Sequence, residues 1–247
     1  MPVLWQDVRV SLLSVEVAGR RMNRGLPELS TTERTRLRRM REKGRTDRNE
    51  LYAVLSAAFI CHLGVVVDGA PMVVPTVYGF DEQNLYLHGS VASRSLLAAA
   101  DDSVAACVTV TVVDGLVLAR SVFEHAVNYR SAMIYGPMRP LTEPAAKLAA
   151  LRCVSEHAAP GQWDYARRPN RQELAATSLL TLALTEASVK IRSGPPDDGD
   201  GPDAALGLWA GELPLAAVWE RPVPDPALRG AVPVPPHIAR RAGTRMP

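Results

Sequence analysis

Two strand-like runs joined by Asp68-Gly69 constrain the fold of this chain more than any other feature. Residues 59–67 and 70–80 are rich in Val, and an Asp-Gly pair between such runs is a strong signal for a tight β-hairpin. A third strand-like run, ending near residue 90, follows a short polar stretch. Consecutive hairpins of this kind predict an antiparallel sheet.

Further strands and helices follow in an order typical of an α+β protein. A second Asp-Gly pair, Asp114-Gly115, predicts that residues 103–120 form two more strands around a turn. Additional strands are expected at 129–141, 178–185, 187–192 and 213–219. Helices are expected at 93–100, 143–157 and 170–177, and from about 47 to 55 with Asp47 or Asn49 as the N-cap. Hairpins with inserted helices favour a small closed β-barrel with peripheral helices.

The 247 residues predict one main domain with two appendages. Residues 1–30 show no regular period and are expected to form a loosely ordered arm. The main domain is expected over residues 31–220, and a Pro-rich tail over 221–247.

Charge and hydropathy narrow the function classes. With 28 basic and 26 acidic side chains, the formal charge of +2 argues against a strongly basic nucleic-acid-binding protein. A basic stretch at residues 34–48 keeps nucleic-acid binding as a minor alternative. No run approaches the roughly 20 apolar residues that span a bilayer, and charged residues interrupt the N-terminal segment where a signal peptide needs apolar ones. We therefore expect a cytoplasmic protein with no membrane partner.

Common catalytic and cofactor motifs are absent from the sequence. It has no dinucleotide-binding GxGxxG, no P-loop and no HExxH. The three cysteines form no CxxC pair, and the five histidines form no i, i+4 pair, so no metal site is predicted.

The segment after the third strand has the composition of a phosphate site. His88-Gly89-Ser90 ends that strand, and Ser93-Arg94-Ser95 begins the next helix. A helix start offers unpaired N–H groups, serines add hydroxyl donors, and an arginine fork suits a phosphate dianion. The alternative is a capped surface helix whose Arg94 is merely solvated.

This order of segments resembles the split-barrel flavoproteins of the pyridoxamine 5′-phosphate oxidase-like superfamily. It is most similar to their flavin-nucleotide-binding, nitroimidazole-resistance-like branch. The resemblance extends over roughly residues 31–236 and includes CHLGVVVDGAPMVVPTVYGF, LYLHGSVASRSL, TVVDGLVLARSVFEHAVNYRS, ASVKIRSGPP and LWAGELPL. It implies a six-stranded antiparallel split barrel that dimerises with itself and holds FMN at the subunit interface, with FAD or a deazaflavin as alternatives.

The resemblance also implies roles for individual residues. Ser93 and Arg94 would bind the flavin phosphate, the backbone of residues 74–78 would run along the isoalloxazine ring, and His88 would lie near the flavin. The cofactor-binding residues expected on this basis are Val74, Pro75, Thr76, Val77, Tyr78, His88, Gly89, Ser90, Ser93, Arg94, Ser95, Asn128, Arg130, Lys190 and Trp209.

A polar block at residues 124–131 lies between two apolar strands. In the resembling proteins its histidine, asparagine and arginine approach the cofactor, which makes His125 the expected catalytic proton donor. Lys190 and Trp209 would close the pocket from the partner subunit. The alternative for the block is a hydrogen-bonded loop that plugs a gap.

The predicted function is therefore a flavin-dependent oxidoreductase that acts on a small molecule. The alternative is a flavin-binding storage or sensor protein without turnover. The C-terminal Arg-x-His pattern of the pyridoxal-phosphate-forming oxidases is missing, which argues against vitamin B6 oxidation.

Overall fold

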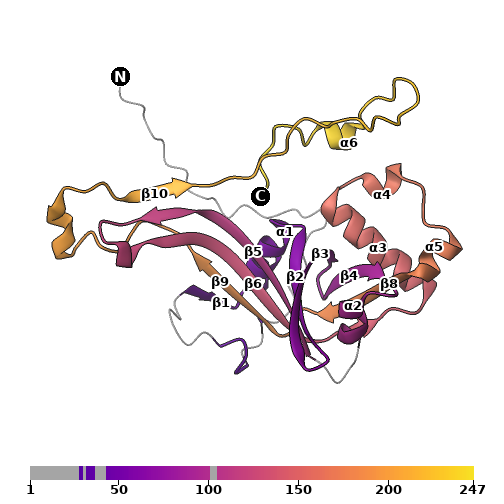
Figure 1. Ribbon diagram of the computed structural model, residues 1–247, viewed down its shortest axis with the longest axis horizontal. Helices are drawn as coiled ribbons and strands as arrows, with labels where there is room; N and C mark the ends of the chain where they lie inside the picture. The colour runs from indigo at the N-terminus through magenta and orange to yellow at the C-terminus, as the bar shows by residue number, and fades with distance from the viewer. Residues whose placement is uncertain (1–27, 30–31, 37–42, 101–104) are drawn as a thin grey trace.

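The computed structural model describes residues 28–29, 32–36, 43–100 and 105–247, and its centre is one strongly curved antiparallel sheet (Figure 1). The strands run in the order β1-β9-β6-β5-β2-β3-β4-β8-β7, and β10 pairs with β5. Their bounds are Gly44–Arg45 (β1), Ile60–Val67 (β2), Ala70–Phe80 (β3), Asn84–Ser90 (β4), Ala105–Leu118 (β5), Ala126–Pro137 (β6), Arg139–Pro140 (β7), Thr177–Ala183 (β8), Ala187–Arg192 (β9) and Gly211–Pro214 (β10).

The helices lie around this sheet. They are Arg48–Ser56 (α1), Arg94–Ala99 (α2), Pro144–Ala158 (α3), Gln162–Tyr165 (α4), Arg171–Ala176 (α5) and Pro236–Ala239 (α6), with short 3-10 turns at Val122–Glu124 (η2) and Pro202–Leu206 (η3). As expected, Asp47 caps α1 by accepting a hydrogen bond from the Asn49 N–H at 2.9 Å. The antiparallel α+β class is thus confirmed.

The predicted number of six strands is wrong, because ten are present in the described part of the chain. Two of the strands that no sequence pattern indicated, β1 and β7, have two residues each. Such short edge strands carry too few residues for a visible alternating pattern, so the sequence signal for them was weak.

The two Asp-Gly pairs have different outcomes. Asp68 and Gly69 have φ of 52° and 79° and join β2 to β3 in a two-residue turn, as predicted. The hairpin predicted at Asp114-Gly115 is wrong, because β5 runs through both residues as one strand. Its register against β6 shifts between Val113 and Gly115, which makes Asp114 the extra residue of a β-bulge.

The close approach of β10 explains why Gly115 lies there. A Cβ at this position would lie 2.7 Å from the Leu213 carbonyl oxygen, so only glycine leaves room for the β10 backbone. The glycine that signalled a turn in the sequence therefore permits strand pairing.

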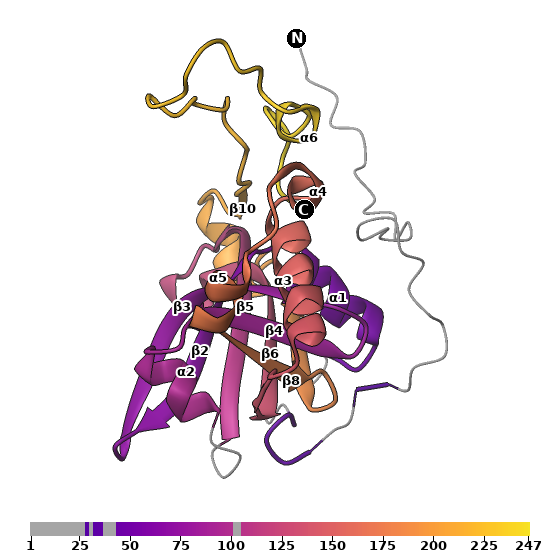
Figure 2. The same cartoon turned by 90° about the vertical axis from the view of Figure 1, so that its right-hand side faces the viewer.

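One apolar core fills the concave side of the sheet. α1 contributes Leu51, Val54 and Leu55, which pack with Leu63 of β2 and Ile134 of β6. On the other side α3 lies across β3 and β4 (Figure 2). A Cβ at Gly79 would lie 2.6 Å from the backbone of Val154, so this glycine lets α3 rest directly on β3.

The C-terminal segment returns to the helices on the convex side. In the Pro-rich stretch predicted as a tail, α6 contacts α4 through a 2.9 Å hydrogen bond between His237 Nε2 and Gln162 Oε1. The Arg241 guanidinium donates to the Ala158 carbonyl at 2.7 Å and lies over the Trp219 ring. Most of the 1–30 arm lies outside the described residues. Among all the residues that the structure describes, no helix has the length and apolar character needed to cross a membrane.

Candidate functional site

The β2–β3 turn and the start of α2 lie next to each other. Arg94 Nη2 donates to Asp68 Oδ2 at 2.7 Å, and the two side chains are 69% and 82% exposed. A pair this exposed contributes little to stability, so Arg94 is available to an anionic ligand at low cost.

The serines of this region have mainly weak local partners. Ser90 Oγ accepts a hydrogen bond from the Ala92 N–H, and the hydroxyls of Ser93 and Ser95 lie 3.1 Å apart. Ser93 occupies the N-cap position of α2 but makes no side-chain capping bond. Gly89 lies behind them, where its missing side chain leaves room for Leu96 of α2. The predicted phosphate residues are thus brought together.

The strand expected to run along a flavin ring has one open edge. β3 pairs with β2 over Ala70 to Val77, but within the described ladders it pairs with β4 only from Tyr78 onward. Alternate residues of an antiparallel strand direct their backbone groups to opposite edges, so part of the backbone groups of residues 74–77 face an edge without a paired strand, and Pro75 contributes no N–H. Such groups need partners, and the edge of a planar heterocycle can supply them.

Tyr78 is an exception within this segment, because its side chain belongs to the core. It is fully buried, and its hydroxyl lies 2.6 Å from the Leu55 carbonyl oxygen and 2.9 Å from that of Ala58. Burial raises the pKa of this phenol far above its usual range. Its backbone is engaged as well, because Tyr78 pairs with Leu87 of β4 and its N–H donates to the Phe59 carbonyl at 3.4 Å.

The polar block at 124–131 lies far from α2, at the outer end of the projecting β5–β6 hairpin (Figure 1). We call residues 111–131 of this hairpin the β5–β6 arm. His125 is exposed, and its Nδ1 accepts a hydrogen bond from the Ala119 N–H at 3.1 Å. In one copy of the chain, His125 and the start of α2 do not form one site.

Asn128 and Arg130 are engaged in bonds within the protein. Asn128 is buried; it donates to Glu212 Oε2 at 2.6 Å and accepts from the Arg192 guanidinium. Arg130 makes a two-pronged ion pair with Asp114, with Nη2 2.8 Å from Oδ1. These contacts match the alternative of a hydrogen-bonded plug within a single chain.

The two remaining predicted residues lie near the same arm. Lys190 Nζ lies 5.8 Å from the ring centre of Tyr129. Trp209 is 69% exposed and packs beside Gly211 at the start of β10. Neither lies at the start of α2.

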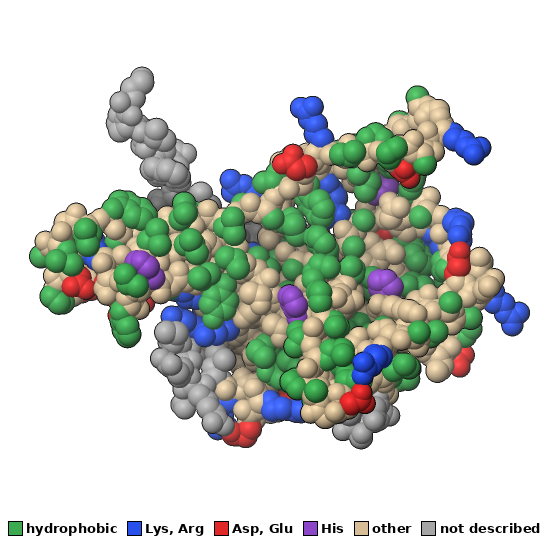
Figure 3. Space-filling model, viewed as in Figure 1, with side chains coloured by type: hydrophobic (Ala, Val, Ile, Leu, Met, Phe, Trp, Pro, Cys, Tyr) green, Lys and Arg blue, Asp and Glu red, His purple; other side chains and the backbone are tan. Residues whose placement is uncertain are grey.

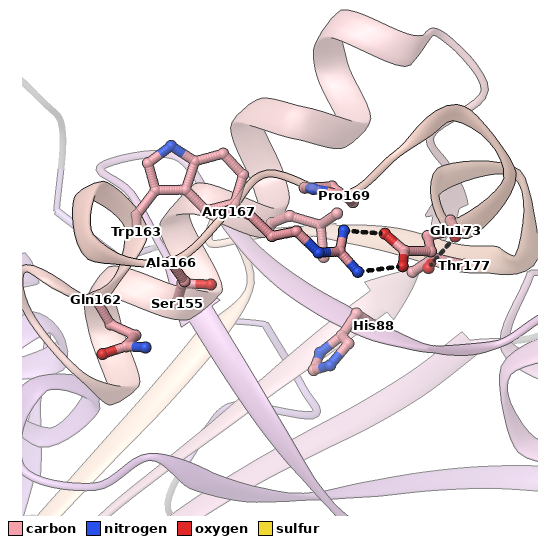
Figure 4. Close-up of a pocket in the computed structure, with 10 residues that line it drawn as sticks. His88, Ser155, Gln162, Trp163, Ala166, Arg167, Pro169, Glu173 and Thr177 are labelled. Atoms are coloured by element: carbon pink, nitrogen blue, oxygen red, sulfur yellow. Dashed lines mark hydrogen bonds and ion pairs between the residues drawn. The ribbon is translucent and has the colours of Figure 1, made fainter. Parts of the chain in front are cut away.

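His88 opens into a cavity that the sequence did not indicate. The cavity has a volume of about 420 Å³ and lies between the outer face of β4 and the α3–α5 segment (Figure 4). It is lined by His88, Leu151, Ser155, Gln162, Trp163, Ala166, Arg167, Pro169, Glu173 and Thr177. Most of these residues come from loops and short helices about 75 positions after His88 in the chain, and the sequence carried no motif that joined them.

Electrostatics distinguish this cavity from the start of α2. Arg167 pairs with both carboxylate oxygens of Glu173 at 2.8 and 2.6 Å, and the bond from Arg167 holds the pKa of Glu173 well below its usual range. Burial lowers the pKa of His88, which favours the neutral imidazole. Within the described residues, no group of three or more His, Cys, Asp or Glu side chains is arranged to bind a metal ion.

Comparison with known proteins identifies the family. Residues 47–191 match the pyridoxamine 5′-phosphate oxidase family. The chain belongs to this family. The match spans β2 to β9 and includes both the start of α2 and the His88 cavity.

Two solved structures resemble this chain over most of its length. The flavocytochrome Anf3 from Azotobacter vinelandii is 35% identical, with a TM-score of 0.80 over 86% of this chain and 98% of its own. The FAD and heme binding protein from Mycobacterium smegmatis is 35% identical, with a TM-score of 0.78 over 83% and 98%.

A more distant structure shares the fold. A 5-nitroimidazole antibiotic resistance protein from Bacteroides thetaiotaomicron is 18% identical, with a TM-score of 0.51 over 60% of this chain and 86% of its own. The family match over residues 47–191 confirms the expected resemblance to the pyridoxamine 5′-phosphate oxidase-like superfamily. No curated protein matches this chain.

Proposed function

We propose that this protein binds a flavin and acts as a flavin-dependent redox enzyme. The observation that carries the proposal is the open edge of β3 beside the exposed Arg94–Asp68 pair. A planar ring with hydrogen-bonding edges suits the open edge of β3, and a phosphate suits Arg94. Family membership and the flavin in the names of two proteins that are 35% identical support the same assignment.

The residues at this site would bind and orient the cofactor. Backbone groups of residues 74–77 would hydrogen-bond the ring edge, and Arg94 would exchange Asp68 for the cofactor phosphate. A bound flavin supplies one- or two-electron transfer, and the protein tunes it through such contacts. The small-molecule substrate would approach the ring face that the protein leaves open.

A second copy of the chain would complete this site. The β5–β6 arm carries exposed apolar side chains, which gather over its surface (Figure 3). Val122 and Phe123 are 83% and 90% exposed at its tip. Exposed apolar groups of this size favour a protein–protein contact. We propose a two-fold homodimer in which the arm of one copy, with His125, reaches the flavin held by the other.

Light scattering tests the assembly. An obligate dimer with more than about 2,000 Å² of buried surface should remain a dimer at micromolar concentration. A monomer at that concentration would contradict the proposed interface.

The cofactor can be identified from purified protein. The released chromophore is expected to be a flavin, and its mass separates FMN, our first assignment from sequence, from FAD, which the Mycobacterium smegmatis protein binds by name. Reduction of the bound flavin by NAD(P)H faster than free flavin supports an oxidoreductase. Bound flavin that no reductant reaches faster than free flavin supports the storage or sensor alternative.

Haem is a second candidate cofactor for this chain. Two proteins 35% identical to it are named as a flavocytochrome and as an FAD and heme binding protein. A haem iron needs an axial ligand, for which a neutral imidazole is common. Burial lowers the pKa of His88 and favours its neutral form, which makes its imidazole one candidate ligand. We therefore propose a protein that carries both flavin and haem.

A further inference from the structure

The C-terminal segment closes on itself and packs against the body of the protein. The Trp219 N–H donates to the Thr244 carbonyl at 2.9 Å, and the Met246 N–H donates to that of Ala217 at 2.9 Å. We call residues 217–246 the C-terminal loop. Its helix α6 lies beside α4 (Figures 1 and 2), and the Trp219 ring stacks on that of Phe59, just before β2, with ring centres 5.7 Å apart. The loop is therefore held against the body from both of these sides.

A second cavity lies between the C-terminal loop and the end of α3. Its volume is about 240 Å³, and all of its lining residues except Glu220 and Arg241 are apolar. The lining consists of Ala158, Ala159, Trp219, Glu220, Pro222, Ile238, Arg241 and Ala242. Sites for drug-sized ligands usually have about 300–1,000 Å³. This smaller cavity therefore suits a single ring or a short hydrocarbon chain.

Arg241 places a fixed guanidinium in the wall of this cavity. Its Nη1 donates to the Ala158 carbonyl at 2.7 Å, and its central carbon lies 4.1 Å from the centre of the Trp219 ring. A guanidinium has five N–H donors, and within the described residues the structure gives Arg241 this one hydrogen bond. The group is thus held in place from one side while it keeps donors for a further partner.

Arg241 also lacks the counter-charge that other partly buried arginines of this chain have. Arg120 and Arg130 pair with Asp198 and Asp114 at 2.9 and 2.8 Å. In the part of the chain that the structure describes, no carboxylate forms an ion pair with Arg241. Burial lowers the pKa of Arg241, because it disfavours the charged form and no anion compensates. An anion in the cavity would supply that compensation.

The combination of walls and charge narrows the class of ligand. A phosphate ion would pair with the guanidinium but would leave the apolar walls unused, and a neutral hydrocarbon would leave Arg241 without a counter-charge. A carboxylate on an apolar body uses both, since its two oxygens match the planar guanidinium. Glu220 is exposed at the cavity, so water solvates its carboxylate and it repels a bound anion only weakly.

We propose that this cavity binds a small apolar carboxylate, with Arg241 as the partner of the carboxylate and with Trp219 and Ile238 against the apolar body. The site shares no residue with the proposed flavin site, and it does not depend on the proposed function. A bound ligand would contact both the C-terminal loop and the end of α3. It would therefore stabilise the attachment of the loop to the body.

Titration of the full-length protein with 3-phenylpropanoate, which has one ring and one carboxylate, tests the proposal. The indole N–H signals in NMR spectra report on each tryptophan, and Trp219→Phe identifies the signal of Trp219. We expect this signal to shift and saturate, while those of the other tryptophans stay in place. Calorimetry gives the dissociation constant. The neutral amide of the same acid should bind at least about tenfold more weakly, the loss expected for a hydrogen bond to a charged group.

Matched variants separate the cavity from general attraction between charges. Arg241→Gln removes the charge but keeps a donor for the Ala158 carbonyl, and it should weaken binding at least about tenfold. Arg240→Gln makes the same change at an exposed neighbour and should leave the affinity unchanged. Ala242→Leu keeps Arg241 but fills part of the cavity, so it should also abolish binding.

Several outcomes would overturn the proposal. These are a wild type that does not bind 3-phenylpropanoate, an amide that binds as tightly as the acid, and equal losses in Arg240→Gln and Arg241→Gln. If Arg241→Gln detaches the loop, Ala242→Leu decides, because unchanged affinity in that folded variant contradicts binding in the cavity. Flavin content, measured separately, should be the same in all variants, so a protein without flavin would leave this inference standing.

Discussion

The start of α2 and the end of the β5–β6 arm carry similar polar residues but use them differently. At α2, Arg94 has one exposed partner, Asp68, and Ser93 leaves its capping position unused. At the arm, Asn128 bonds to two charged side chains and Arg130 is paired twice with Asp114. Spare hydrogen-bonding capacity, and not polarity alone, therefore marks the better candidate for binding a ligand.

The largest effect on stability is expected in the β5–β6 arm, where the polar side chains already have partners, from Asn128→Ala. This change leaves the buried Arg192 guanidinium without one of its acceptors and should lower the free energy of unfolding by about 2–3 kcal/mol. Urea unfolding measures the loss. Flavin binding per folded molecule should stay unchanged, and a stable variant with weakened flavin binding would move Asn128 into the cofactor site.

At the start of α2, where hydrogen-bonding groups are left without strong partners, Arg94→Ala should weaken flavin binding instead of stability. We expect flavin affinity to fall by about 1.5–3 kcal/mol, the range for hydrogen bonds to charged groups, with unfolding almost unaffected. Fluorescence titration gives the dissociation constant. Asp68→Asn is the matched control: it removes the competing carboxylate, tolerates the left-handed turn, and should bind flavin at least as tightly. An unchanged constant in Arg94→Ala would remove Arg94 from the site.

His125→Ala tests whether the arm of one copy serves the site of another. Since His125 is exposed and bonds only a nearby N–H in its own chain, the variant should fold and keep its flavin. Flavin reoxidation by a bound acceptor should slow by about ten- to a hundredfold, the lower end for a positioned acid. Stopped-flow absorbance measures this rate, with Glu124→Ala as an exposed neighbour that should leave it unchanged. If both variants reoxidise as fast as the wild type, His125 has only a local structural role.

The smallest effect is expected from the Arg130–Asp114 pair. With side chains 26% and 36% exposed, the pair should contribute about 0.5–1 kcal/mol. A double-mutant cycle with Asp114→Ala and Arg130→Ala gives the coupling free energy from denaturation curves. Coupling near zero, together with weaker flavin binding in Arg130→Ala alone, would favour the cofactor role that the resemblance implies.

Local patterns predicted the elements that depend on neighbours in sequence. The Asp68-Gly69 turn, the Asp47 cap of α1 and the approximate positions of α2 and α3 follow from backbone preferences and spacing, which act over a few residues. The same signals failed at Asp114-Gly115, because a distant strand, β10, decides what the glycine does there. The cofactor role of the polar block at 124–131 came from the family resemblance and stays a prediction, because it depends on a second copy of the chain.

The sequence by itself determined the antiparallel α+β class, the family resemblance and the grouping of Ser93 with Arg94, because each rests on contiguous residues. Only the tertiary structure decided which side chains keep spare bonding capacity. The Tyr78 hydroxyl is hydrogen-bonded within the core, and Asn128 is hydrogen-bonded to Arg192 and Glu212. His88, in contrast, keeps a buried ring nitrogen without a partner. Its cavity is formed by segments about 75 positions further along the chain, and no local pattern records which distant residues will surround a side chain once the core has formed.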